Sequence, residues 1–429
     1  MLRVLFFEDE KAHQLSPVAL ARPVFELVCG RMSLRERVVR THRPAVWGAV
    51  VRPYLRDAYA AEFSDTFVND FLWLRDAPTV VVNGRWMPGP ASLNKVADAQ
   101  VGVVDGTVAW FVLHPDEAHV LSEESWASEF GRIVKDREAV DAGGRMVEYP
   151  WDLVNYNADQ LTFDFRQYAR PTGYDQPNVA VLGSQSDVAV DDDVLIDPFV
   201  VLDARHGPIS IDRGAHIQSF TRLEGPCHVG RGSQLFRALV REGSTIGPVC
   251  RVGGEIEESI LHGFVNKYHE GFIGHSYVCP WVNLGAMTSN SDLKNDYSSV
   301  SVPLSGDMID TASTKVGCFI GDHSKTAIDS MFNTGSSIGV MSMVLPGGEL
   351  LPKHIPSFSR IWHGELADGW DLDRSLETVR TTMMRRDQEL TQVQEHLLRT
   401  LHSQTADERH RAIKRHNDKR QAAKDKRRQ

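Results

Sequence analysis

Polar side chains suited to proton transfer and ligand binding are concentrated in the segment NKYHEGFIGHSYVCPWVNLGAMTSNSDLKND, residues 266–296. An imidazole accepts a proton from an attacking amine or hydroxyl near neutral pH, so His269 is a candidate general base. Lys267 is a candidate contact for a phosphate group, and Asn283 for hydroxyl or amide groups. The alternative for His269 is a purely structural role, in which it caps a loop. His275 is interpreted as a structural residue.

The elements that must position these residues follow a period of six. Apolar residues recur at that step in two frames, and the second contains one Thr: Ile211, Ile217, Leu223, Val229 and Leu235, then Ile320, Thr326, Phe332, Ile338, Val344 and Leu350. This period fits neither a helix nor an alternating strand. It indicates three short strands and three corners per coil, and such coils are stable only when they stack.

We therefore predict a left-handed parallel β-helix of hexapeptide repeats over residues 180–360, with about nine coils. A chance spacing in a β-sandwich is the alternative. The step fails around Arg241, in Glu255–Glu270 and in Asn290–Thr314. Insertions in a solenoid become loops on one face, often the binding face, and the polar segment lies in or beside these breaks.

The regions on either side have other patterns. Residues 1–170 alternate short apolar strands with helical stretches, which predicts an α/β domain. Residues 366–429 predict a helical tail. In it Leu372, Leu376, Val379, Met383, Leu390, Val393 and Leu397 form a heptad stripe. That stripe is either a coiled coil between subunits or a helix packed on the β-helix of its own chain.

Charge and cysteine content narrow the class of protein. The 429 residues carry a net charge of −10, but ten Lys and Arg against four Asp and Glu follow Leu401. An acidic body argues against a nucleic-acid-binding core, whereas the basic end is expected to be a frayed arm that is solvated or contacts a polyanion. Five cysteines without a CxxC pair, no signal peptide and no membrane span predict a cytoplasmic protein.

The polar segment resembles the acetyltransferase domain of the GlmU-like bacterial family, in which a divergent sugar-1-phosphate nucleotidyltransferase domain precedes a β-helix. The matching motifs are GGEIEESI, NKYHEGFIGHSYV, WVNLGA, SNSDLKN and GDHSKTAIDSMFNTGSSIG. The resemblance implies that His269 is the base. It also implies that Lys267, Asn283, Asn290 and Lys294 bind substrate, and that the chain is a homotrimer with acyl sites between adjacent β-helices.

The same resemblance implies acetyl-CoA or another acyl-CoA as cosubstrate. Asp322, His323 and Lys325, in the GDHSK run, are then candidates for holding the phosphates or the pantetheine of CoA. A solvated turn is an equally good interpretation of this run.

The N-terminal region resembles the sugar-phosphate nucleotidyltransferases, but lacks their glycine-rich loop. In SPVALARPVFELVCGRMSLRER, the candidate phosphate contacts are Arg22, Arg31, Arg35 and Arg37, since guanidinium groups bind phosphate bidentately. The positions that match metal ligands hold amides, Asn83, Asn155 and Asn157, with Asp152 and Asp159 as alternatives. Mg²⁺ prefers carboxylates, so these amides would bind it less well.

The leading hypothesis is a bifunctional transferase that joins an NTP to a sugar 1-phosphate and acylates an amino sugar from acyl-CoA, as in UDP-N-acetylglucosamine synthesis. Two alternatives are a nucleotidyltransferase with a structural or regulatory β-helix, and a non-catalytic scaffold that binds a nucleotide sugar.

Overall fold

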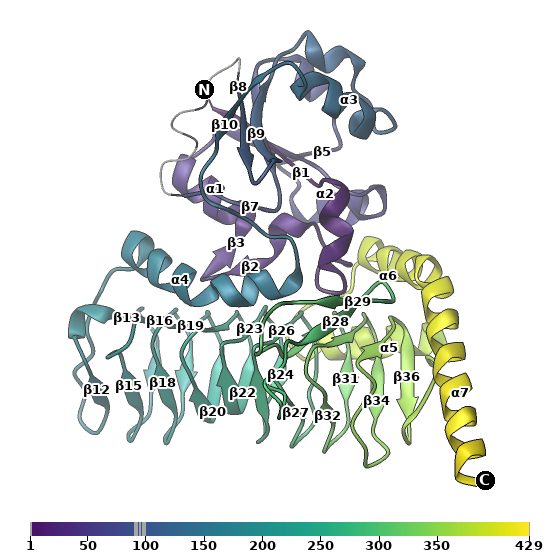
Figure 1. Ribbon diagram of the computed structural model, residues 1–429. Helices are drawn as coiled ribbons and strands as arrows, with labels where there is room; N and C mark the ends of the chain where they lie inside the picture. The colour runs from purple at the N-terminus through teal and green to yellow at the C-terminus, as the bar shows by residue number, and fades with distance from the viewer. Residues whose placement is uncertain (1, 90–92, 94–95, 97–99, 429) are drawn as a thin grey trace.

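The computed structural model describes residues 2–89, 93, 96 and 100–428 of the chain. An N-terminal α/β domain lies on a long β-helix, and C-terminal helices cover one end of that β-helix (Figure 1). Of the helices in these described ranges, none combines the length and the apolar character needed to cross a membrane.

The N-terminal domain is built on a mixed sheet that contains the predicted buried strands. β1 pairs in parallel with β4 and β6, whereas β9 runs antiparallel to β6 and β8. The strand order is β10 (Glu138–Asp141), β8 (Gln100–Val104), β9 (Thr107–Leu113), β6 (Thr79–Asn83), β1 (Arg3–Phe7), β4 (Val46–Val50) and β5 (Phe67–Val68).

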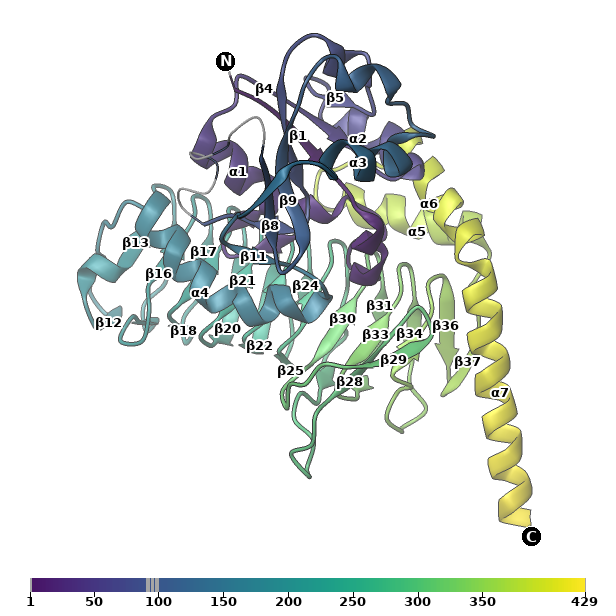
Figure 2. The same ribbon diagram turned by 45° about the horizontal axis from the view of Figure 1, so that its top comes forward.

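Helices and two small ladders complete this domain. The helices are α1 (Leu34–His42), α2 (Arg56–Glu62), α3 (Trp126–Val134) and α4 (Pro150–Tyr168). The ladders pair β2 (Val28–Cys29) with β3 (Met32–Ser33), and β7 (Trp86–Met87) with β11 (Arg145–Met146). α4 extends along the top of the β-helix and contacts three of its strands (Figure 2).

The β-helix has three faces, which the chain visits in the order A, B, C in each coil. Face A is a parallel sheet of nine strands, in agreement with the predicted nine coils. They are β13 (Val188–Val190), β16 (Ile209–Ile211), β19 (Cys227–Val229), β21 (Ser244–Ile246), β23 (Ile260–Leu261), β26 (Tyr277–Val278), β30 (Cys318–Ile320), β33 (Ser336–Ile338) and β35 (His354–Ile355).

Faces B and C are joined by two long strands, β20 (Gln234–Val240) and β22 (Arg251–Glu257), which bend from one face to the other. Face B also contains β14 (Leu195–Ile196), β17 (His216–Ile217), β24 (Asn266–Lys267), β31 (Lys325–Thr326), β34 (Met343–Leu345) and β36 (Ser359–Trp362). Face C also contains β12 (Ala180–Leu182), β15 (Val201–Asp203), β18 (Arg222–Glu224), β25 (Phe272–Gly274), β27 (Ser289–Asn290) and β32 (Met331–Phe332).

The hexad residues fill the interior of this stack, as predicted. All five members of the first frame are at most 1 % exposed. Leu350 is the exception in the second frame, since it is 59 % exposed and Leu351 takes the buried position. The glycine-containing turn before it shifts the frame by one residue. The parallel register is that of the predicted hexapeptide β-helix and is consistent with its left hand.

The break after Asn290 is an insertion between β26 and β30 that forms an antiparallel hairpin. Its strands are β28 (Ser301–Leu304) and β29 (Asp307–Asp310). Val300 and Val302 of this insertion are fully buried in the same apolar cluster as the N-terminal domain core. The insertion therefore packs inward and is part of the folded body.

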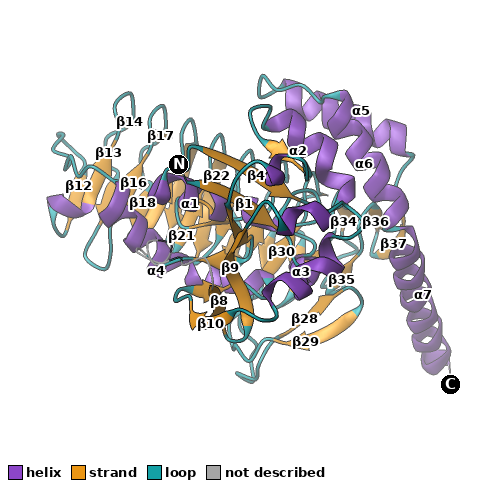
Figure 3. Ribbon diagram, turned by 90° about the horizontal axis from the view of Figure 1, so that it is seen from above, coloured by secondary structure: helices purple, strands orange, loops and turns teal. Residues whose placement is uncertain are grey.

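The heptad stripe packs on the β-helix of its own chain, as one of the two interpretations predicted, since Leu376 and Val379 share a buried cluster with Phe358, but it is not one continuous helix. It is divided into two antiparallel helices, α5 (Leu372–Met384) and α6 (Gln392–Gln404), joined by residues 385–391 and linked by an ion pair between Arg380 and Glu395. α6 contacts α2 of the N-terminal domain (Figure 3). The sequence signal for the division is a capping box, in which Thr391 and Gln394 begin α6.

The basic end is also different from the predicted frayed arm, because it forms the helix α7 (Ala406–Arg428). α7 packs on β37 (Glu365–Asp368) at the end of the β-helix. Arg409 is 3 % exposed and binds Asp368 at 2.8 Å, and Ile413 packs against the interior of the last coil. These contacts order its first turns and cover the open end of the stack.

The two large domains are joined by a buried polar network around α4. Asn157 accepts a hydrogen bond from the Gly30 amide at 2.6 Å and donates to the Gly243 carbonyl of the β-helix at 2.7 Å. Thr245 donates to the Gly30 carbonyl at 2.9 Å. Gly30 has a φ of +74°, and a Cβ there would lie 2.4 Å from a carboxylate oxygen of Asp164, so only glycine fits this turn.

The buried pair of Arg37 and Asp164 gives a first prediction. Both side chains are almost fully buried, and Arg37 also donates to the Cys29 carbonyl. Asp164→Ala leaves a buried guanidinium without a counter-ion, so we expect the free energy of unfolding to fall by about 3–5 kcal/mol in a denaturant titration. Asp159→Ala, on the exposed side of the same helix, is the matched control and should cost less than about 1 kcal/mol. Equal losses in the two variants would contradict this assignment.

Candidate functional site

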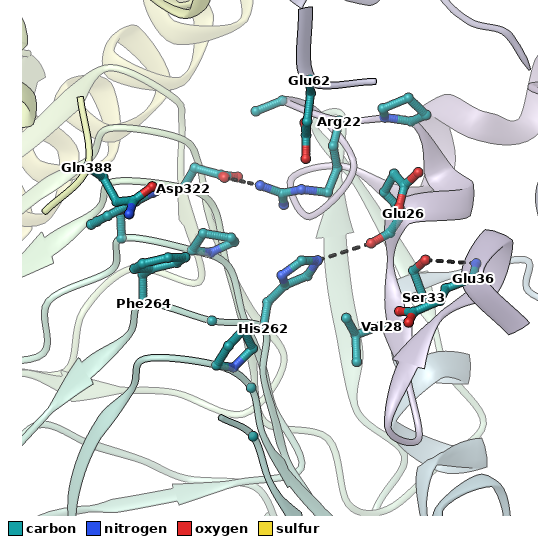
Figure 4. Close-up of a pocket in the computed structure, with 18 of the residues that line it drawn as sticks. Arg22, Glu26, Val28, Ser33, Glu36, Glu62, His262, Phe264, Asp322 and Gln388 are labelled. Atoms are coloured by element: carbon teal, nitrogen blue, oxygen red, sulfur yellow. Dashed lines mark hydrogen bonds and ion pairs between the residues drawn. The ribbon is translucent and has the colours of Figure 1, made fainter. Parts of the chain in front are cut away.

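A cleft of ≈ 750 Å³ lies between the two domains. One wall is the segment of residues 21–36 together with α2, and the opposite wall is the corner between faces A and B of the β-helix. The connection between α5 and α6 borders the opening (Figure 4). Two groups of predicted ligand-binding residues meet here although some 300 positions separate them in the chain: Arg22, Arg31 and Arg35 on one wall, and Asp322 and His323 on the other.

The three predicted arginines of the cleft are each neutralised by a carboxylate. Arg22 forms an ion pair with Asp322, and Arg31 binds Asp212 at 2.9 Å, so both pairs join the two domains. Arg35 pairs with Glu26 within the N-terminal wall. Arg37 is not in the cleft. The predicted phosphate contacts therefore already form ion pairs with carboxylates of the same chain. The buried Nη1 of Arg31 has no hydrogen-bond partner among the described residues.

Histidines line the cleft in their neutral form. Burial and the nearby charge of Arg22 lower the pKa of His262 to about 3, and its Nε2 donates to the Glu26 carbonyl at 3.1 Å. Burial also lowers the pKa of His228 to about 4 and that of His323 to about 3. Neutral imidazoles add hydrogen-bonding capacity without adding charge.

Flat rings form a stack on the β-helix side of the cleft. The Phe264 and Trp281 rings lie 4.3 Å apart at 18°, and the Trp281 and His323 rings lie 6.2 Å apart at 3°. Phe264 and Trp281 are separated by the length of one coil, so they occupy the same corner on successive coils. Sequence reasoning missed both residues, although this spacing was a signal that could have found them.

His269 lies at a different corner, between faces B and C. The corner residues follow β14, β17 and β24 and precede β15, β18 and β25 in successive coils. His269 is exposed, and its ring contacts Tyr268 edge to face at 5.0 Å. An exposed imidazole is accessible to a substrate, as the predicted general base requires.

The other residues predicted around His269 differ in how much they are buried and in how many hydrogen bonds they form within the protein. Lys267 is 1 % exposed, and its Nζ donates to the carbonyls of Gly253 and His269. Burial lowers the pKa of Lys267 to about 8. In this position Lys267 supports the loop that carries His269 and does not face a ligand.

Asn290 is also a structural residue in this geometry, because it is 5 % exposed and bonds both the amide and the carbonyl of Gly274. Asn283 accepts a hydrogen bond from Asn266 at 2.7 Å and lies between Asn266 and Lys325 on face B. Lys294 donates to Ser298 and Ser299 within the insertion. Asn283 and Lys325 are half-buried on face B, in register with Asn266.

The predicted metal ligands do not form a metal site as they lie. Asn83 donates to Asp9 at 2.8 Å and to the Val108 carbonyl, while its oxygen accepts from the Arg85 amide. Asn157 belongs to the interdomain network, and Asn155 is exposed on α4. Among the described residues no group of three or more His, Cys, Asp and Glu is suited to a metal ion.

Guanidinium groups take the positions beyond the carboxyl ends of β1 and β6. Arg52 binds Glu8 at 3.0 Å, and the fully buried Arg85 binds Asp9 at 2.6 Å and Glu148 at 3.1 Å. Although burial disfavours its charge, Asp9 has a pKa below the usual value because Arg85 stabilises the carboxylate. These residues as placed do not fit Mg²⁺, since the acidic oxygens already have a cationic partner.

Comparisons with known proteins place these features in a family context. Residues 4–171 match the sugar nucleotidyl transferase family. The chain is 31 % identical over 200 residues, 46 % of its length, to a bifunctional sugar-1-phosphate nucleotidylyltransferase/acetyltransferase of Sulfurisphaera tokodaii. It is 31 % identical over 105 residues, 24 % of its length, to the bifunctional protein GlmU of Jannaschia sp. strain CCS1. The predicted GlmU-like relationship is thus confirmed at modest identity.

The chain covers 44 % and 22 % of the lengths of these two relatives. Among solved structures, the UDP-N-acetylglucosamine acyltransferase of Arabidopsis aligns with 50 % of this chain and 80 % of its own, at 10 % identity and a TM-score of 0.21. The same enzyme from Campylobacter jejuni aligns with 52 % of this chain and 94 % of its own, at 8 % identity and a TM-score of 0.16.

The corner around His275 gives a prediction about pH. Its Nδ1 lies 2.8 Å from Asp292 and its Nε2 lies 3.4 Å from Glu258. Burial alone would lower the pKa of His275, but the two carboxylates raise it to about 9. His275 is therefore a cation at neutral pH, and it ties the insertion to the β-helix, as the structural interpretation of this residue requires.

The pKa of His275 is higher in the folded protein than the usual value of about 6.5, so protonated His275 stabilises the fold. This stabilisation is fully present below about pH 6.5. We expect the free energy of unfolding to fall by about 2–3 kcal/mol as pH rises through 9. His275→Gln should flatten this part of the profile, whereas His206→Gln, at an exposed loop, should leave it unchanged. A profile that keeps its slope in His275→Gln would show that another group is responsible.

Proposed function

We propose that this relative of the bifunctional sugar-1-phosphate nucleotidylyltransferase/acetyltransferases is itself a transferase of sugar-nucleotide synthesis with two activities. One joins an NTP to a sugar 1-phosphate and releases pyrophosphate. The other transfers an acyl group from acetyl-CoA or another acyl-CoA to an amino sugar. The observation that carries the proposal is a sugar nucleotidyl transferase domain fused to a nine-coil β-helix with an exposed imidazole at one corner.

In the acyl transfer, the amine of the sugar attacks the thioester carbonyl, a C–N bond forms and the C–S bond breaks. His269 accepts the proton that the amine loses and returns it to the departing thiolate of CoA. Lys267 acts as a positioning residue, because its ammonium bonds the carbonyl of His269. Asn283 and Lys325, on the adjacent face B, are the proposed contacts for polar groups of the substrates.

A homotrimer is part of the proposal, and an apolar stripe on the His269 corner supports it. Phe199, Phe220, Met287 and Ile328 occupy this corner in other coils and are 52–70 % exposed. Phe199 and Phe220 stack on each other at 5.9 Å. Large apolar side chains aligned on one edge are typical of a surface that another subunit covers.

For the nucleotidyl transfer, we propose the interdomain cleft as the ligand site. The unpartnered Nη1 of Arg31 offers a hydrogen bond to a phosphate oxygen, and the cleft has the volume of a small-molecule site. Mg²⁺ is not assigned to protein ligands, because the amides predicted to bind it are engaged elsewhere. The five free, buried cysteines support a reducing compartment, which we propose to be the cytoplasm.

A second candidate function follows from the same electrostatics. The carboxylates beyond β1 and β6 are paired with Arg52 and Arg85, and the cleft arginines are paired as well. This arrangement favours a domain that binds a nucleotide sugar without transferring a nucleotidyl group.

The acyltransferase activity is tested by release of free CoA from acetyl-CoA in the presence of glucosamine 1-phosphate and other amino sugars. We expect His269→Ala to lower the rate about 10²–10⁴-fold, because general acid–base catalysis contributes that much. His206→Ala, an exposed histidine on another loop of the β-helix, should retain the native rate. An absence of turnover with the whole panel would exclude acyl transfer to amino sugars.

The nucleotidyltransferase activity is tested by pyrophosphate release from each NTP and a panel of sugar 1-phosphates, with and without Mg²⁺. We expect Arg31→Gln to reduce release at least about tenfold, because one charge-assisted hydrogen bond to phosphate is lost. Arg132→Gln, on the surface of α3, is the charge-matched control. Binding of a UDP-sugar without any pyrophosphate release would support the second candidate in place of the first.

A further inference from the structure

The last hairpin of the β-helix carries two tryptophans at the surface. β36 and β37 pair antiparallel at this end of the stack (Figure 1). Trp362 is the last residue of β36, and Trp370 lies in the segment between β37 and α5. Trp362 is 47 % exposed and Trp370 is 36 % exposed, and their rings meet edge to face at 5.4 Å. A single exposed apolar residue is normal, whereas adjacent exposed indoles are typical of a surface that binds a partner.

Two arginines lie against the ring of Trp370. The guanidinium carbon of Arg360 lies 4.1 Å from the centre of this ring, and that of Arg374, on α5, lies 5.8 Å from it. Arg360 and Trp362 flank the fully buried Ile361 on β36, so both side chains point outwards from face B. These contacts join Arg360, Trp362, Trp370 and Arg374 into one surface, which we refer to as the tryptophan surface.

The two arginines of the tryptophan surface form no ion pair with a carboxylate in the described ranges. The buried Nε of Arg360 has no hydrogen-bond partner there either. A guanidinium that stacks on an aromatic ring keeps N–H groups at its edge, where they can bind a carboxylate bidentately. The charge of both arginines is therefore available to a ligand. Three carboxylates of the neighbouring elements pair with other arginines: Asp368 with Arg409, Asp373 with Arg399 and Glu365 with Arg420.

We propose that the tryptophan surface docks an acidic segment of another protein, in which carboxylates flank one large apolar side chain. The carboxylates pair with Arg360 and Arg374, and the apolar side chain covers Trp362. Tryptophan and arginine are enriched among the residues that dominate the affinity of protein interfaces. Because the chain has a net charge of −10, an acidic partner is repelled by most of its surface and is directed to these two cations.

This surface goes beyond the proposed function, because none of its residues takes part in either transfer reaction. The test is selection of peptides from a displayed random library on the full-length protein, after removal of peptides that also bind Trp362→Ala. We expect the remaining peptides to be rich in Asp and Glu around one aromatic or leucine residue. Binding of a synthesised, fluorescent member, measured by anisotropy, should weaken as ionic strength rises from about 50 to 200 mM, since salt screens such contacts.

Substitutions of Arg374 separate a binding role from a structural one. Arg374→Gln should weaken binding of the peptide about tenfold, and Arg374→Glu should abolish it. Arg374 is exposed, so both variants should keep the unfolding temperature of the native protein. The matched controls are Arg132→Gln on α3 and Tyr297→Ala, an aromatic residue that is 71 % exposed on the insertion. Both should bind the peptide as the native protein does.

Native affinity in Arg374→Glu, or an equal loss in Arg132→Gln, would overturn the proposal. A selection that yields no peptide specific for the native protein, or only peptides without acidic residues, would overturn it as well. Sedimentation of the native protein and of Trp362→Ala should give the same mass. Dissociation of an oligomer in Trp362→Ala would show that a second copy of the chain covers this surface in place of an acidic partner.

Discussion

The architecture depends on the need to cover the outer surface of face A. In most coils the inward residues of this face are aliphatic, but in the middle coils the outward residues are apolar as well, namely Ile260, Tyr277 and Phe319, all fully buried. Each such side chain contributes about 1.5–3 kcal/mol when it is removed from water, so this surface cannot remain exposed. The N-terminal domain and α4 cover it, and the interdomain cleft exists because that contact ends at the edge of face A.

Polar residues take over where the apolar surface stops. One coil before Ile260 the outward position holds Thr245, which donates a hydrogen bond to the Gly30 carbonyl. Two coils before it the outward position holds His228, which bonds Ser210 and lies near Asp212. Arg31 crosses to Asp212 in the same region, and Arg22 crosses to Asp322 farther along the β-helix. Interdomain ion pairs of this kind set the orientation of the domains more than their affinity, because desolvation offsets most of the attraction. They also leave the interior of the cleft electrically balanced.

The hexad period predicted the β-helix and its number of coils because the pattern is local: each short strand has one inward residue and is followed by a corner. It failed at Leu350, where one extra residue in a turn shifts the frame. The heptad stripe was misleading for a related reason. Leu376 and Leu397 do line a buried surface, but a turn between them reverses the chain, and only the capping box at Thr391 marks it. The exposed His269 and the cleft arginines were found by residue type, whereas Glu26, Asp212 and His262 were not, because their roles arise from contacts between distant segments.

The geometry of one coil relates the two candidate sites. Phe264, at the cleft corner, and His269, at the opposite edge of face B, are five residues apart, so at most about 17 Å of extended chain separates them. Arg251, Asn266, Asn283 and Lys325 form a polar row on this face, in register across successive coils. A small sugar phosphate is too short to contact both corners at once. The cleft corner and the His269 corner are therefore separate sites on one coil, and the polar row of face B is the surface that lies between them.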